Sequence, residues 1–289
     1  MFMLSAYLSS PSLSLPSTGR RVPYSYPFSH VTLIRTVVVS KGVALSHLPC
    51  SSGPAQQQLA VTDLRDHDSV AVDLTFSAIK ECLSDAELRA AVSLRIRTFY
   101  NFKQSFGVED YKRYLLEREY EALKERIAGK WMTFKRVSCI NVTIPVSPTF
   151  ESFYELYSSC KVSYGGNEHI VVGTLDVNQC FGLADEIIGK KPEGSGSDLR
   201  RAYLSNLCVA KELHRNGLGY ALVSNSKIVA RQWGVTDLYV HVAKDNEAAQ
   251  RLYDKCGFVY ENEEPAWQAR FLGRPQRFLL WFDLREDNL

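Results

Sequence analysis

Two short stretches in the last third of the chain carry residues suited to hold a phosphorylated ligand and to move a proton. The first is a polar turn with two glycines one residue apart, Gly217 and Gly219, between an apolar run and an amphipathic helical pattern. A glycine-bearing turn at a helix start leaves backbone N–H groups unpaired, with the positive end of the helix dipole behind them. Such a place is suited to a pyrophosphate.

The glycine pair alone does not specify a nucleotide-binding fold. A Rossmann fingerprint needs a third glycine where this chain has Leu222, and a P-loop needs a Gly-Lys-Ser/Thr ending that is absent here. Taken in isolation, such a pair most often makes only a tight turn or a cap. The phosphate interpretation therefore depends on the second stretch, which follows the next predicted strand.

The second stretch reads Asn246-Glu247-Ala248-Ala249, then Leu252-Tyr253, then Gly257-Phe258. Asn246 is predicted to cap a helix, a role that needs no ligand. Tyr253 follows it by seven residues, about two helical turns, so the two share a helix face. A phenol placed there is either a core aromatic or, beside a reacting sulfur, a proton donor.

Together the two stretches resemble the GNAT superfamily, the acetyl-CoA-dependent N-acetyltransferases. Its pattern is Gln/Arg-x-x-Gly-x-Gly/Ala after a strand, then Asn-x-x-Ala…Leu-Tyr-x-x-x-Gly-Phe after another strand. This chain matches from Gly217 to Phe258 but has His214 in place of Gln or Arg. The resemblance implies an α/β (α+β) fold, with a mixed, mostly antiparallel sheet of about seven strands flanked by helices.

The resemblance also implies acetyl-CoA as cosubstrate, no metal, and direct transfer in a ternary complex. The implied cofactor-binding residues lie on the strand before the turn, on the turn itself and on the second helix. They are Leu207, Cys208, Val209, Arg215, Asn216, Gly217, Leu218, Gly219, Tyr220, Asn246, Glu247, Ala248 and Tyr253. Within this set, the Val209 N–H is expected to face the thioester oxygen, and Tyr253 is the predicted catalytic acid for the leaving thiolate.

No general base is assigned from the sequence. Many family members use an acidic residue on the central strands, where this chain offers Ser205, Asn206, Tyr239 and His241. The ordinary pKa of a histidine suits the task, while a structural role for His241 is the alternative. Direct attack by a neutral amine, with water relaying the proton, is also open.

The acceptor is expected to be a protein or peptide amine. The leader and the segment Tyr203–Ala210 resemble the plant plastid GNAT proteins, which are associated with acetylation of protein N-termini and lysine side chains. The alternatives are a small-molecule N-acetyltransferase, acting on a polyamine or an amino acid, and a non-catalytic acetyl-CoA-binding module. Cys208, in the cofactor strand, is a poor nucleophile by this interpretation.

The first 62 residues are expected to form a transit peptide and disordered leader. The first acidic residue is Asp63, although the chain holds 32 Asp and Glu, and the leading part is rich in Ser, Pro and Leu. This composition is typical of organelle presequences, and a tail without a targeting role is the alternative. The first 19 residues carry no charged side chain, which favours the chloroplast stroma over the mitochondrion. Residues 70–286 are expected to form the GNAT domain.

Composition argues against several other classes. The seven cysteines are scattered without a Cys-x-x-Cys pair, which speaks against a disulfide framework or a zinc site. The net charge of +2 comes without a cluster of Lys, Arg and aromatic residues, so no nucleic-acid partner is expected. The longest apolar run, Val31–Leu45, is interrupted by Arg35 and Lys41 and is too short to span a membrane.

Outside the two stretches the pattern predicts further elements. Strands are expected over 70–78, 137–146, 170–177 and 277–282, and helices over 84–99, opened by a capping box, and 109–127. The stretch between the strands at 146 and 170 and residues 188–198 are expected to be loops. Three arginines near the last turn are expected to form a solvated basic loop, with a site for an acidic acceptor as the alternative: Arg270, Arg274 and Arg277.

Overall fold

The computed structural model describes residues 77–103, 106–132, 134–146, 153–164, 166–180 and 200–285. The predicted leader, most of the first predicted strand and the predicted loop at 188–198 lie outside these ranges. The strands are β1 (Ala78–Glu81), β2 (Phe134–Pro145), β3 (Lys161–Tyr164), β4 (Asn167–Cys180), β5 (Arg201–Val209), β6 (Asp237–Ala243), β7 (Val259–Glu263) and β8 (Arg277–Asp283). The helices are α1 (Asp85–Phe99), α2 (Val108–Ile127), α3 (Tyr154–Cys160), α4 (Leu218–Gln232), α5 (Glu247–Lys255) and α6 (Ala266–Phe271).

The strands form one mixed sheet in the order β1-β2-β4-β5-β6-β8-β7, with β3 paired to β4. Every pairing is antiparallel except the one between β5 and β6. The predicted mixed, mostly antiparallel sheet flanked by helices is thus confirmed, with eight strands where about seven were expected.

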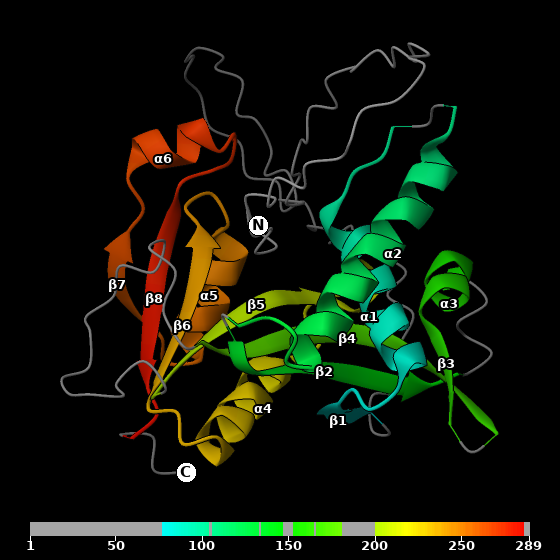
Figure 1. Cartoon of the computed structure of the whole chain (residues 1–289), viewed down its shortest axis with the longest axis horizontal. Coiled ribbons are helices and arrows are strands. Elements are labelled where there is room, and N and C mark those ends of the chain that lie inside the picture. The colour runs from blue at the N-terminus through cyan, green and yellow to red at the C-terminus, as the bar shows by residue number, and fades with distance from the viewer. Residues whose placement is uncertain are drawn as a thin grey trace, which may run out of the picture.

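Helices cover both faces of this sheet (Figure 1). Arg95 of α1 reaches Thr174 and Asp176 of β4, whereas a Cβ on the preceding Gly173 would lie 3.1 Å from Leu222 of α4. Because successive strand residues point to opposite faces, α1 and α4 lie on opposite sides of β4. The apolar core around β4 and β5 is therefore enclosed by helices on both sides, which positions polar groups of these strands deep in the protein.

The start of α1 is fixed by the capping box that the sequence predicts. Ser84 Oγ accepts from the Glu87 N–H at 3.3 Å, and the Glu87 carboxylate accepts from the Ser84 N–H at 2.9 Å. The same carboxylate pairs with Lys80 of β1 at 2.9 Å and accepts from the Tyr164 hydroxyl of β3 at 2.5 Å. One buried side chain therefore ties α1 to two strands, which sets the position from which the rest of α1 reaches β4.

The prediction of a loop between β2 and β4 is wrong for the second half of that segment. Residues 154–164 form α3 and β3 instead, and β3 pairs with residues 167–170 of β4 on the side away from β2. Three side chains in this segment are buried, Leu156, Cys160 and Val162. Their spacing is too short to give a clear periodic pattern, so only packing against β4 reveals the two elements.

The sheet divides where β5 leaves β6. The two strands pair in parallel only from Arg201–Asp237 to Leu204–Val240, whereas β6 stays paired with β8 as far as Ala243. Figure 1 shows β5 running away from β6 beyond this point. Residues 205–209 are thus paired on the β4 side and have no strand on the β6 side among the described residues. The site described below is built on this edge.

No helix in the part of the chain that the structure describes is long and apolar enough to cross a membrane.

Candidate functional site

The strands β5 and β6 diverge after the Leu204–Val240 pair, and the space between them beyond this pair is called the opening. The unpaired edge of β5 presents backbone N–H groups toward this opening. The Ala210 N–H donates to the Val172 carbonyl at 2.8 Å, so Ala210 points its N–H at the β4 side. Backbone groups of successive strand residues alternate in direction, so the Val209 N–H points away from β4. The Val209 N–H is therefore a backbone donor on the open edge of β5.

The residue at the family's Gln/Arg position, His214, links this strand to the following turn. Its Nε2 lies 3.0 Å from the Val209 carbonyl oxygen, so Nε2–H donates to it. The ring therefore binds the end of β5 and leaves the neighbouring Arg215 exposed to solvent. Both side chains are exposed, and the His214 ring is the one held at the end of β5.

The turn before α4 exposes a row of backbone N–H groups. Arg215 and Gly217 both adopt left-handed backbone conformations, with φ of 68° and 78°. The Asn216 side chain holds the turn by donating to the Leu213 and His214 carbonyls at 3.2 and 3.3 Å. Turns of this kind form concave anion sites.

Helix α4 begins directly after this turn without a side-chain cap. The N–H groups of its first turn, from Leu218 to Tyr220, therefore have no helical acceptor. The positive end of the helix dipole adds to them. Of the side chains here, Leu218 is buried in the core, while Tyr220 is exposed and lies below the Lys255 ammonium, 5.4 Å from the ring centroid.

Gly219 serves packing as well as the turn. A Cβ at this position would lie 3.2 Å from Leu252 Cδ2 of α5, so the glycine permits close approach of α4 and α5. Asn246 caps α5 through its Oδ1, which accepts from the Ala249 N–H at 3.1 Å, as predicted. Glu247 and Ala248 are exposed in the first turn of α5. The start of α4 thus packs against Leu252, in the second half of α5.

The remaining strand residues of the predicted set are partly or fully enclosed. Leu207 and Val209 are half-buried and pack on the core, as the predicted main-chain role permits. Cys208 is 5% exposed, and burial raises the pKa of its thiol to about 12. A thiol that keeps its proton is a poor nucleophile.

Tyr253 lies buried in the last turn of α5. Its ring packs edge-on against Phe258, with centroids 5.5 Å apart. Burial raises the pKa of its hydroxyl, and the nearby Tyr203 and Cys256 raise it further. The phenol is therefore protonated at neutral pH and able to donate.

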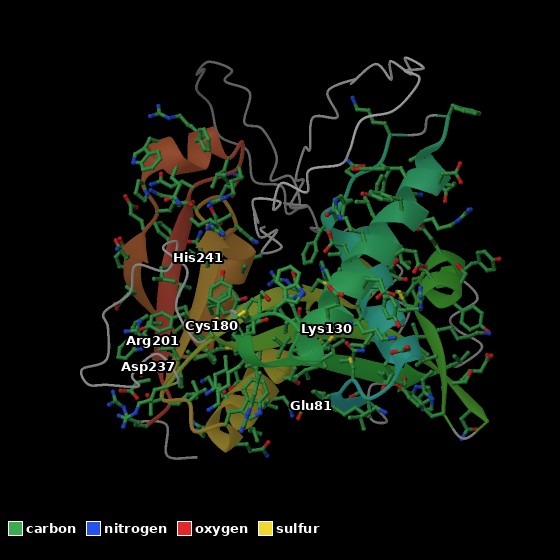
Figure 2. All side chains as sticks on the ribbon, viewed as in Figure 1. Glu81, Lys130, Cys180, Arg201, Asp237 and His241 are labelled. Carbon is green, nitrogen blue, oxygen red and sulfur yellow. The ribbon has the colours of Figure 1, made fainter. Side chains whose placement is uncertain are left out.

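His241 of β6 forms a hydrogen-bonded pair with Tyr203 of β5. Its Nδ1 lies 3.0 Å from the Tyr203 hydroxyl, and Figure 2 shows it on the β6 side of the opening. Burial lowers its pKa to about 3, assisted by the positive charges of Arg277 and Arg274. The imidazole is thus neutral and well placed to accept a hydrogen bond, but it holds an added proton poorly.

Among the other strand candidates for a base, Ser205 accepts a hydrogen bond from Asn178 Nδ2 at 3.0 Å and Tyr239 is buried in the sheet.

The prediction that three arginines form a solvated basic loop is wrong for two of them. Arg274 and Arg277 are 8% and 5% exposed, and both pair with the buried carboxylate of Glu264. Only Arg270 is exposed. Glu264 follows β7 directly and draws the two guanidinium groups inward, which produces the positive charge felt at His241.

Comparison with known proteins identifies the class. The sequence profile of the Acetyltransferase (GNAT) family matches residues 145–258. A chloroplastic GCN5-related N-acetyltransferase 7 of Arabidopsis thaliana is 51% identical over 256 residues, which cover 85% of this chain and 93% of the relative. The chloroplastic GCN5-related N-acetyltransferase 6 of the same plant is 33% identical over 189 residues, covering 62% of this chain and 60% of that protein.

The chain therefore belongs to the GNAT family of acetyltransferases. Both relatives are chloroplastic proteins, which bears out the plastid location predicted from the leader.

The low pKa of His241 predicts a pH-dependent stability. A histidine that titrates near pH 6.5 when unfolded and at about 3 when folded contributes stability above pH 6.5 that is lost as the pH falls. Between pH 7.5 and pH 5 the wild-type protein should lose about 1–2 kcal/mol more than a His241→Gln variant. Urea unfolding at the two pH values measures this difference, and equal losses in both proteins would contradict the burial of a neutral imidazole.

Proposed function

We propose that this protein is an acetyl-CoA-dependent protein N-acetyltransferase of the plastid stroma, which acetylates N-terminal α-amines, lysine ε-amines or both. The observation that carries the proposal is the unpaired edge of β5, which is followed by the exposed N–H groups before α4; the buried phenol of Tyr253 is close enough to Tyr203 of β5 for that residue to raise its pKa. The GNAT domain is proposed to span residues 70–286, with residues 1–62 acting as the transit peptide.

The backbone on this edge suits each part of acetyl-CoA. An extended pantetheine arm with amide groups can add to residues 205–209 as a strand adds to a sheet edge. The pyrophosphate then reaches the turn and first helical residues from Arg215 to Tyr220, where N–H groups and the helix dipole favour an anion. In this arrangement Asn246, Glu247 and Ala248 of α5 lie along the opposite side of the cofactor.

Transfer then needs no covalent enzyme intermediate. The neutral acceptor amine attacks the thioester carbonyl, a C–N bond forms, and the C–S bond breaks to release the thiolate of coenzyme A. The Val209 N–H stabilises the oxyanion that develops on the carbonyl oxygen, and Tyr253 protonates the thiolate. The proton lost by the amine passes through water and restores the Tyr253 hydroxyl, with the neutral His241 as a hydrogen-bond acceptor beside the path, so that no net proton is released. Cys208, buried and protonated, takes no part as a nucleophile.

A protein acceptor is supported by the surface of α6. Trp267 and Phe271, four residues apart and therefore on one helix face, are 65% and 84% exposed. Exposed apolar side chains that gather on one face are typical of protein contact sites. The two competing proposals are a small-molecule acceptor, such as a polyamine or an amino acid, and an acetyl-CoA-binding module without catalysis.

The acceptor class can be tested in a bacterium that expresses residues from about Val61 onward. We expect new acetyl groups on protein N-termini or lysines, and we expect them to be at least tenfold fewer with Tyr253→Phe, because the thiolate then leaves without its proton donor. Mass spectrometry of the whole proteome measures both. No new acetylation by a folded protein that binds acetyl-CoA would favour a small-molecule acceptor or a binding module, and equal acetylation by Tyr253→Phe would remove Tyr253 as the acid.

The pyrophosphate site can be tested at Gly217. Substitution by valine should weaken acetyl-CoA binding at least tenfold, because a β-branched residue resists the φ of 78° and the turn loses its shape. Isothermal titration calorimetry measures the affinity. Gly234→Val is the matched control, since Gly234 has a φ of 75° at the other end of α4 with no neighbour within 4 Å of its Cβ position. Equal affinity in Gly217→Val and the control would exclude the turn as the binding site.

A further inference from the structure

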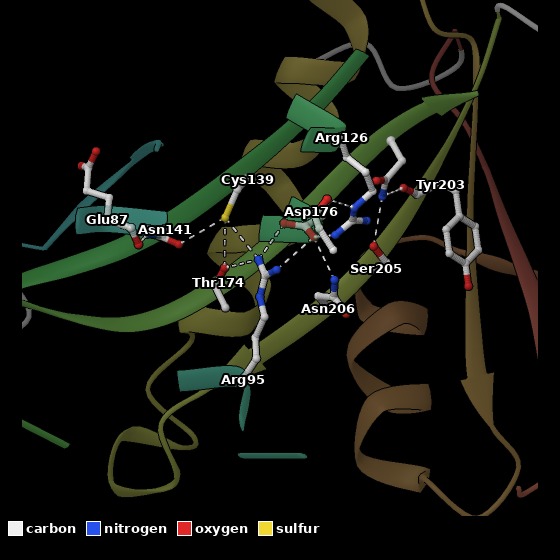
Figure 3. A network of polar contacts seen from close by, with 12 residues as sticks. Glu87, Arg95, Arg126, Cys139, Asn141, Thr174, Asp176, Tyr203, Ser205 and Asn206 are labelled. Carbon is white, nitrogen blue, oxygen red and sulfur yellow. Dashed lines mark hydrogen bonds and ion pairs between the residues drawn. The ribbon is translucent and has the colours of Figure 1, made fainter. Parts of the chain in front are cut away.

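A buried carboxylate lies at the point where β5 leaves β6. Asp176 of β4 is fully buried, and Arg95 of α1 holds it with two contacts, Nη2–Oδ1 at 2.6 Å and Nη1–Oδ2 at 3.1 Å. Arg95 Nη2 also donates to the Thr174 hydroxyl at 2.8 Å, so the guanidinium spans two residues of the strand (Figure 3). A bidentate pair of this kind fixes direction as well as distance.

The same carboxylate holds the neighbouring strand. Asn206 Nδ2 of β5 donates to Asp176 Oδ2 at 2.8 Å (Figure 3). Asp176 stands opposite Ser205 and Thr174 stands opposite Cys208, so three steps along β5 span two along β4. This is a β-bulge, and Asn206 within it has a φ of 58°. The side-chain amide is therefore bonded at the residue where the strand is most distorted.

The bulge coincides with the end of the β5–β6 pairing. The last parallel pair is Leu204–Val240, and Asn206 follows two residues later. A bulge bends its strand and increases the local twist, which turns β5 away from β6. The direction of the open edge, including the Val209 N–H, therefore depends on the backbone conformation at Asn206.

We propose that Asp176, oriented by Arg95, acts as a positioning residue for acetyl-CoA by holding the bulge through Asn206. This inference rests on the proposed function, since it assigns a role to residues that lie outside direct contact with the cofactor. The carboxylate stays ionised for this role. Burial raises its pKa, but the charges of Arg95 and Arg126 and the Asn206 hydrogen bond outweigh this, so that the pKa of Asp176 lies below its usual range.

Asn206 offers a cleaner test than Asp176. Removing the carboxylate would leave Arg95 and Arg126 buried without their shared partner, which can prevent folding. By contrast, Asn206→Gly and Asn206→Ala leave the Arg95–Asp176 pair intact. The Asn206 Oδ1 is itself buried without a hydrogen-bond partner in the described part of the chain, so its loss leaves nothing newly unpaired.

The two variants separate backbone positioning from general stability. Both variants lose the hydrogen bond to Asp176. Glycine adopts a φ of 58° without strain, whereas alanine populates this conformation roughly tenfold less than glycine does. We expect the Kd for acetyl-CoA to rise about threefold in Asn206→Gly and at least tenfold in Asn206→Ala. Calorimetric titration at 15 °C measures the Kd, and circular dichroism checks that each variant is folded at that temperature.

Each result has a distinct meaning. A rise in Kd for alanine with partial rescue by glycine supports the positioning role. Lowered melting temperatures with wild-type Kd in both variants would show that the network only stabilises the fold, and would overturn the inference while leaving the proposed function intact. Absence of acetyl-CoA binding by the wild-type protein would overturn the proposed function and this inference with it.

Discussion

The structure depends on one broken pairing, the separation of β5 from β6 after Leu204. Backbone N–H and C=O groups need hydrogen-bond partners, and an open strand edge inside a domain invites an extended partner chain. On one side of this edge, Asp176 of the neighbouring strand β4, held by the Arg95 guanidinium of α1, defines where β5 bends. On the other side of this edge, no strand of the described residues pairs with β5 beyond Leu204, so a ligand can take the place of a strand there.

The polar groups around the opening are neutral where the reaction needs neutrality. Burial keeps the Tyr253 phenol and the Cys208 thiol protonated and keeps the His241 imidazole uncharged. The exposed positive character is found instead at the turn before α4, in the helix dipole and Arg215. In the proposed site, a positive end at the turn before α4 is thus separate from a neutral end around Tyr253 and His241.

The sequence could predict the parts of the site that depend on local chain conformation. The turn at Gly217, the start of α4 and the Asn246 cap were all predictable, because glycine, helix periodicity and capping act within a few residues. The strain at Asn206 and its bond to Asp176 were not, because they depend on pairing between strands 30 residues apart in the sequence. The one available signal was Asp176 in the largely apolar run Ile170–Val177, because a buried carboxylate demands a partner.

Long-range packing also explains the errors. The sequence predicts that Arg274 and Arg277 are solvated, because nothing in the local sequence shows that both pair with the buried Glu264 carboxylate. His214 departs from the family pattern, and only the structure shows that its ring binds the Val209 carbonyl. Segment 154–164 lacked a periodic pattern, so its helix and strand became visible only against the edge of β4.

The central claim is that the open edge of β5 binds the pantetheine arm of acetyl-CoA. Hydrogen exchange of backbone amides, followed by mass spectrometry with and without acetyl-CoA, tests this claim most directly. The account predicts slower exchange in residues 205–209 and 215–220 when acetyl-CoA is present, with β7 and β8 unchanged. Binding of acetyl-CoA without any change in residues 205–209 would contradict it, because the cofactor would then lie elsewhere on the protein.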